Sequence, residues 1–151
     1  MKNLLFIAAL SLVMVGMACN NDDDNNPVTM NDDCSVSYTI DGQQFTENDI
    51  VVCALLDGTL NVGLIGSNDI QLQVNNLTGP GTFTFPNDDV IILVDLDDGT
   101  RLGAEAGTIT VSDLSDSKAS GTFSVTLRDI NDWMQEGPTM SLTNGQFSAS
   151  Y

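Results

Sequence analysis

Apolar and polar residues alternate along most of the chain after residue 34. In the first such stretch, Val36, Tyr38 and Ile40 alternate with small polar residues. A period of two places apolar side chains on one face of a β-strand and polar side chains on the other. The alternation recurs over residues 60–64, 70–74, 83–85, 109–111, 123–127 and 147–151. Two further runs, 50–56 and 90–94, are continuously apolar, and we expect strands there that are covered on both faces.

The segments between these strands carry turn residues. Four of them contain an Asp-Gly or Asn-Gly pair, at 41–42, 57–58, 98–99 and 144–145, and such pairs adopt the positive φ that tight hairpins need. Short strands joined by tight turns pair antiparallel. We therefore predict one all-β domain over residues 34–151, an antiparallel β-sandwich or a flattened up-and-down β-barrel of roughly nine or ten strands. Its predicted core contains the aliphatic residues together with Phe83, Phe85, Phe123 and Phe147.

The first 18 residues differ in character from this domain. Lys2 is followed by an uncharged stretch over residues 4–18, which is too short to span a bilayer comfortably and is typical of an export signal peptide. The sequence Gly16-Met17-Ala18-Cys19 resembles the lipobox of bacterial lipoproteins. This resemblance implies cleavage before Cys19, thioether lipidation of Cys19, and membrane attachment through that lipid anchor.

Residues 19–33 form a predicted tether. They contain five aspartates and, over 20–27, no large apolar side chain, so this stretch cannot fold by burial. An acidic run just after the lipidated cysteine resembles the surface-export signal of Bacteroidota lipoproteins. That resemblance implies an outer-membrane protein exposed at the cell surface; the alternative is a spacer on a lipoprotein that faces the periplasm.

Four segments of the domain resemble a Bacteroidota group of small surface lipoproteins of unknown function. They are residues 38–46 (YTIDGQQFT), 107–111 (GTITV), 121–125 (GTFSV) and 142–147 (LTNGQF). These motifs are structural, and the resemblance carries no catalytic residue to this chain.

The charge of the chain limits its partners. It has 21 acidic and four basic residues and a formal net charge of −17. Such a surface repels nucleic acid and anionic lipid, so we expect no nucleic-acid partner. A carbohydrate, a small apolar ligand and a protein partner all stay open.

The cysteine count predicts a disulfide. Once Cys19 is assigned to lipid, Cys34 and Cys53 remain as a pair in an oxidising compartment. The alternative is two buried free thiols.

Candidate catalytic residues are few. The chain has no histidine, which removes Ser-His-Asp and Cys-His nucleophiles. Ser115 and Lys118 match a serine-lysine acylation spacing, but they lie between two alternating strands, and we expect a polar turn. Glu105 and Glu136 are the carboxylates most suited to a paired-carboxylate hydrolase. We predict a protein without enzymatic activity or cofactor.

Two further segments invite a binding hypothesis. Asp95, Asp97 and Asp98 supply oxygens of the kind that bind Ca²⁺, although the spacing is also that of a hairpin tip. Trp133, the only tryptophan, either stacks on a ligand or plugs one end of the barrel.

Together these features predict a lipid-anchored envelope protein that acts as a binding or accessory module. The alternatives are a lipocalin-like barrel that carries a small apolar ligand and, third, a paired-carboxylate hydrolase. A hollow interior favours the carrier, and a filled interior favours the binding module.

Overall fold

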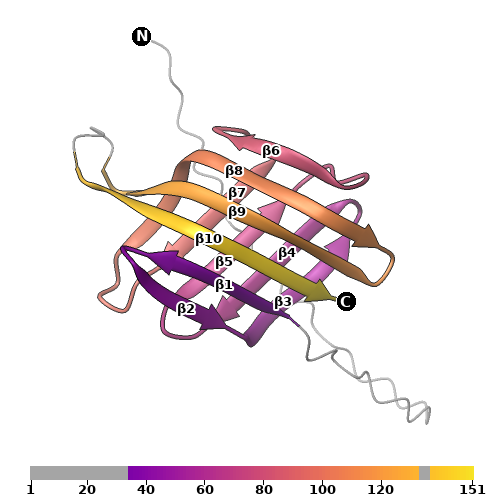
Figure 1. The fold of residues 1–151 in the computed structure, drawn as a ribbon, viewed down its shortest axis with the longest axis horizontal. Helices are drawn as coiled ribbons and strands as arrows, with labels where there is room; N and C mark the ends of the chain where they lie inside the picture. Colours follow the sequence, from indigo (N-terminus) through magenta and orange to yellow (C-terminus); the bar gives the residue numbers. More distant parts are fainter. Residues whose placement is uncertain (1–33, 133–136) are drawn as a thin grey trace, which may run out of the picture.

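The alternating segments form β-strands in the computed structural model, which describes residues 34–132 and 137–151 (Figure 1). All strand pairs are antiparallel, and the all-β prediction is confirmed. The ten strands are β1 (Ser35–Ile40), β2 (Gln43–Glu47), β3 (Asp49–Leu56), β4 (Thr59–Ile65), β5 (Asp69–Val74), β6 (Gly81–Phe85), β7 (Val90–Asp95), β8 (Arg101–Ser115), β9 (Lys118–Asp129) and β10 (Thr139–Ser150). Within these described ranges, no helix has the length and hydropathy of a membrane span.

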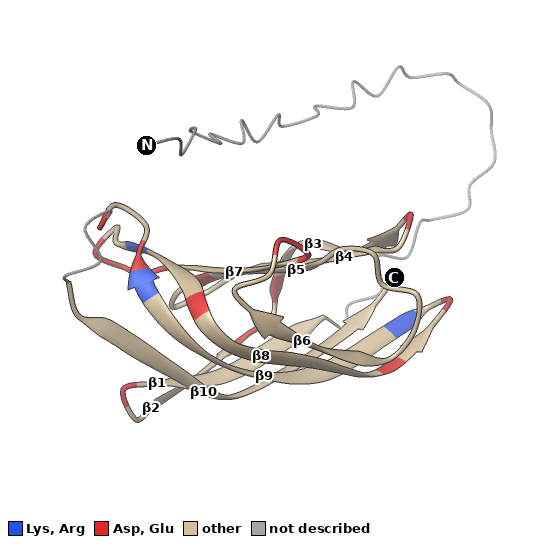
Figure 2. Ribbon diagram, turned by 90° about the horizontal axis from the view of Figure 1, so that it is seen from above, with Lys and Arg blue, Asp and Glu red and all other residues tan. Residues whose placement is uncertain are grey.

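The strands form one sheet that curls into a nearly closed, flattened barrel. Its order is β2-β1-β10-β9-β8-β7-β5-β4-β3, and β6 pairs with β8 beside this path. Viewed from above, β3, β4, β5 and β7 form one layer and the remaining strands form the other (Figure 2). The two terminal strands of the path, β2 and β3, are consecutive in the chain and are separated only by Asn48. The chain therefore passes directly from one edge strand of the sheet to the other.

Strand β8 connects the two layers. Its first residues pair with β7, whereas residues 107–111 pair with β6. Gly107 lies at this change of partner with φ +117°, and a Cβ atom there would lie 2.6 Å from the Cα of Val125. Only glycine combines this backbone conformation with so close an approach to β9.

The alternation correctly predicts the core. Inward-facing side chains such as Val36, Leu72 and Leu127 are fully buried between the layers, and Phe85, Phe123 and Phe147 are at most 7% exposed. Phe83 packs against this core while partly exposed. Twenty-five buried hydrophobic residues thus occupy the space between the two layers.

The two continuous apolar runs are not covered on both faces, so that expectation was wrong. Strand β3 lies at an edge of the sheet, and Val51 and Leu56 are 63% and 68% exposed. In β7, Val90 and Val94 are buried while Ile91 is 38% exposed. Burial alternates along β7 but not along β3, whose first four residues are all exposed. No second layer covers these outer faces, so apolar side chains at the edge contact solvent.

Three of the four predicted turns are hairpin turns, and one is not. Asp41 and Asp57 adopt positive φ between β1 and β2 and between β3 and β4, and Gly99 does so between β7 and β8. Asn144 also has a positive φ of 53°, but it lies inside β10, where the pairing with β9 shifts register. The shift brings Gly145 against the Phe123 ring, so the pair makes a bulge rather than a turn.

The predicted Cys34–Cys53 disulfide is present, with the two Cα atoms 6.4 Å apart. It links the residue before β1 to β3, which terminates the other side of the sheet. Cys34 lies beside the end of β10, because Ser35 pairs with Ser148. The disulfide therefore joins segments from the two edge regions of the barrel.

Candidate functional site

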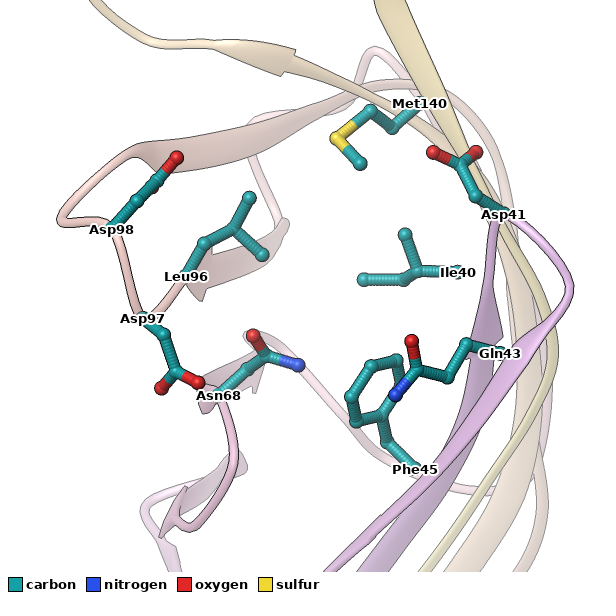
Figure 3. Close-up of a pocket in the computed structure, with 9 residues that line it drawn as sticks. All are labelled: Ile40, Asp41, Gln43, Phe45, Asn68, Leu96, Asp97, Asp98 and Met140. Carbon is teal, nitrogen blue, oxygen red and sulfur yellow. The ribbon is translucent and has the colours of Figure 1, made fainter.

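An open pocket of about 330 Å³ lies at one end of the barrel, and we call it the mouth (Figure 3). The β1–β2, β4–β5 and β7–β8 turns meet there with the start of β10, because each antiparallel pair of strands returns the chain to the same end. Its lining residues are Ile40, Asp41, Gln43, Phe45, Asn68, Leu96, Asp97, Asp98 and Met140.

The wall of the mouth is apolar. The side chains of Ile40, Phe45 and Met140 point into the opening from one side, and Leu96 faces them from the other (Figure 3). Ile40 is only 5% exposed, and the other three pack partly buried against the core. The pocket therefore extends the hydrophobic core outward rather than opening into it.

The rim of the mouth is acidic. Asp41, Asp97 and Asp98 are exposed around the opening. The backbone N–H of Thr100 donates to Asp98 Oδ1 at 2.8 Å, and this hydrogen bond holds the pKa of the Asp98 carboxyl below its usual range. The lining contains no lysine or arginine.

None of the three basic residues of the described ranges lines the mouth. Arg101 donates two hydrogen bonds to Asp95, at 2.6 and 2.7 Å, which lowers the pKa of Asp95. Arg128 pairs with Glu105, which raises the pKa of the guanidinium. Lys118 begins β9 at the opposite end of the barrel. Within the described ranges, none of these three cations forms a salt bridge with a rim aspartate.

A buried network of polar side chains lies beneath the mouth and includes Asn68, one of its lining residues. Glu47, only 3% exposed, accepts hydrogen bonds from the Tyr38 hydroxyl at 3.2 Å and from the backbone N–H groups of Ser67 and Asn68 at 3.1 and 3.2 Å. The Asn68 amide nitrogen donates to the Tyr38 oxygen at 3.3 Å. Burial is the main reason that the pKa of Tyr38 is strongly raised; the Glu47 charge raises it further, and the Asn68 hydrogen bond opposes the shift. This network fixes the β4–β5 turn against β1 and β2.

Asn68 also presents an acceptor to the pocket. The residue is 7% exposed, and its amide nitrogen is used by Tyr38. Its side-chain oxygen points into the opening (Figure 3) and accepts no hydrogen bond within the part of the chain that the structure describes. An acceptor fixed in this way is available to a ligand.

The three aspartates proposed for a cation are only partly brought together. Asp97 and Asp98 both line the mouth, but both oxygens of Asp95 are used by Arg101. Over residues 34–132 and 137–151, no three His, Cys, Asp or Glu residues are grouped so that they could hold a metal ion.

The remaining predicted site residues fall into two groups. Cys19, Trp133 and Glu136 lie outside the described residues, so their predicted roles stay predictions. Glu105 is held by Arg128, and Ser115 and Lys118 flank the β8–β9 turn, where the Ser115 hydroxyl donates to the Lys118 carbonyl at 3.4 Å. These contacts are those of structural residues.

A second depression lies on the outer face of β8, β9 and β10, around the bulge in β10. Hydroxyl and amide side chains line it, including Thr108, Thr122 and Gln146. Its one aromatic residue, Phe123, is 3% exposed. A sugar ring would therefore find little aromatic surface there on which to stack.

Sequence reasoning did not single out Glu47 or Asn68. A signal for Glu47 existed, because the period of two places it on the same face of β2 as Phe45. Asn68 lies in a turn, and no local pattern marks it as buried.

Comparisons of the chain with protein-family models, with curated proteins and with solved structures gave no match. The resemblance to the Bacteroidota lipoprotein group therefore stays a prediction that rests on the motifs alone.

Proposed function

We propose that this protein is a lipid-anchored, non-enzymatic binding module of the bacterial cell envelope, and that it binds its ligand at the mouth of the barrel. The observation that carries this proposal is the position of Cys34. The chain enters β1 at the end where Ser35 pairs with Ser148, whereas Ile40 lies at the mouth. A tether that ends at Cys34 joins the domain opposite the mouth, so an anchor at Cys19 would present the mouth away from the membrane.

The filled interior supports a binding module over a lipocalin-like carrier. A carrier encloses its ligand within the barrel. Here the space between the layers is occupied by large side chains that are at most 1% exposed, such as Tyr38, Leu72 and Ile109. Binding at the mouth needs no opening of the core.

The state of the carboxylates supports a non-enzymatic role over a hydrolase. A catalytic acid needs a raised pKa and access to substrate. Glu105 is neutralised by Arg128, and Glu47 is buried within structural hydrogen bonds. Among the described carboxyls, the clear pKa shifts at Asp95 and Asp98 are downward.

The anchor is tested by replacing its attachment point. In cells that express the full chain, Cys19→Ser should move the protein from the membrane fraction to a soluble fraction, because thioether lipidation needs the thiol. The neighbouring substitution Asn20→Ser is the control and should leave the protein in the membrane. If the Cys19→Ser protein stays membrane-bound while the signal peptide is removed, the lipoprotein assignment is wrong.

Protease treatment of intact cells then determines the side of the membrane. We propose surface exposure, and degradation of the anchored domain by external protease is the expected result. Protection in intact cells, followed by degradation after the outer membrane is permeabilised, would instead place the domain in the periplasm.

A further inference from the structure

We propose that the mouth binds an alkylammonium group, that is, a primary ammonium on an aliphatic stem of about four carbons, the size of a lysine side chain. This inference rests on the proposed function, because it names the ligand class for the same pocket. Three independent properties of the pocket lead to it: its charge, its free hydrogen-bond acceptor and its apolar wall.

The charge of the rim selects a cation. Asp41 and Asp97 stand on opposite sides of the opening (Figure 3), and the described basic residues are engaged or distant. A cation held between carboxylates near a low-dielectric wall gains more than one in bulk water. An anionic ligand would meet repulsion from both sides.

The free acceptor oxygen of the mostly buried Asn68 selects a hydrogen-bond donor. The Asn68 oxygen is held by a network that already uses its amide nitrogen, and it points into the opening. An ammonium carries three N–H donors and no acceptor. It can therefore donate to Asn68 and still reach a rim carboxylate such as Asp97, which lies beside Asn68 in the pocket (Figure 3).

The apolar wall selects an organic cation over a metal ion. Ile40, Phe45, Leu96 and Met140 offer surface for an aliphatic stem, and hydrocarbon walls supply no oxygen ligands to a hard cation such as Ca²⁺. The described residues also lack a group of three metal-binding side chains. A cavity of about 330 Å³ accommodates a four-carbon stem with its ammonium.

The test compares three probes of nearly equal size that differ in charge. The full-length protein, with Ile and Met methyl groups labelled with ¹³C, is reconstituted in phosphatidylcholine nanodiscs and titrated at pH 7 with n-butylammonium, 1-butanol and butyrate. The methyl signals of Ile40 and Met140 report on the mouth, those of Ile91 and Ile109 serve as internal references, and empty nanodiscs are the blank. We expect n-butylammonium to bind most tightly and butyrate least tightly.

Stem length and rim charge are varied separately. Ethylammonium should bind more weakly than n-butylammonium by about fourfold per missing methylene, if each methylene is buried. Asp41→Asn combined with Asp97→Asn should lower the affinity for n-butylammonium by roughly three- to tenfold and leave the affinity for 1-butanol unchanged. The control, Asp88→Asn with Asp113→Asn, removes the same charge from exposed positions at the end of the barrel opposite the mouth. It should change neither the affinity for n-butylammonium nor that for 1-butanol.

Two sources of this chemistry are distinguished by one further probe. Nα-acetyl-lysine methylamide carries the same stem and ammonium within a peptide unit. Binding as tight as that of n-butylammonium identifies a lysine of a protein partner, and binding confined to the free amine identifies a small amine ligand.

The outcomes separate the inference from the proposed function. If 1-butanol or butyrate shifts the Ile40 and Met140 signals at concentrations as low as n-butylammonium does, the cation assignment is wrong and the binding site stands. If the far-end control weakens n-butylammonium as much as the rim variant does, only general charge attracts it, and the inference is also wrong. If no probe moves the mouth signals at millimolar concentration, the mouth is not a ligand site and the proposed function fails with it.

Discussion

Replacing Glu47 with glutamine tests whether the buried network joins the two layers. The carboxylate uses both of its oxygens: Oε1 accepts from Tyr38 and Asn68, and Oε2 accepts from Ser67. Glutamine keeps the shape but has one acceptor oxygen, and its NH₂ group would face a backbone N–H. At least one hydrogen bond to a charged group is therefore lost.

The expected cost follows from these contacts. A hydrogen bond to a charged group contributes about 1.5–3 kcal/mol, and the bonds that remain become neutral and weaker. Two effects reduce the loss: Ser67 is exposed, so water can satisfy its N–H group, and the variant no longer buries a charge. We expect Glu47→Gln to lower the free energy of unfolding by about 2–3 kcal/mol.

Urea unfolding of the full-length protein, followed by far-ultraviolet circular dichroism, measures this loss. Asp49→Asn is the matched control, because Asp49 is exposed two residues further along the chain and its replacement changes the net charge equally. Its effect should stay within about 0.5 kcal/mol. Equal midpoints of urea unfolding for the two variants would refute the claim that the Glu47 network stabilises the contact between the two layers.

Three further predictions concern the barrel. Because burial raises the pKa of Tyr38 above its ordinary 10.0, the folded state keeps this proton where the unfolded state loses it. The contribution of Tyr38 to stability should therefore be constant below about pH 10 and fall above it by up to about 1.4 kcal/mol per pH unit. Tyr38→Phe should flatten this decline in urea titrations, and an unchanged slope would contradict the assignment. The double variant Cys34→Ser, Cys53→Ser should lose about 3 kcal/mol in the chain-entropy model; intact mass and thiol counts on the native protein check the bond directly, and two titratable thiols would disprove it. Gly107→Ala should cost at least about 2 kcal/mol more than Gly99→Ala, since both glycines have positive φ but only Gly107 abuts β9; equal melting temperatures of the two variants would show that the close approach is unimportant.

Much of the fold was predictable because the period of two is a local property of the chain. A residue such as Leu72 or Val125 alternates with polar neighbours, and the pleat of the strand carries it to the inner face whatever its partners are. The Asp-Gly pairs at 41–42 and 57–58 marked hairpins for an equally local reason, since their backbone accepts positive φ. The disulfide followed from counting cysteines, a count that does not depend on geometry.

The errors arose where the local signal is ambiguous. The run at 50–56 is as apolar as a central strand, yet β3 is an edge strand, because edge position depends on strand order. Asn144-Gly145 has the composition of a hairpin, but its positive φ serves a bulge beside Phe123. In both cases the local conformation that the residue types favour was predicted correctly, but the segments that pack beside them were not.

By itself, then, the sequence determined the all-β class, the inward-facing set of residues, most turns and the pairing of Cys34 with Cys53. Only the tertiary structure decided where the mouth lies and what lines it. Its residues come from four separate stretches, near positions 40–45, 68, 96–98 and 140, and a two-residue period carries no information about which strands become neighbours. Strand order and the curvature of the sheet brought these stretches together. The same long-range geometry buried Glu47 and turned the free oxygen of Asn68 toward the opening.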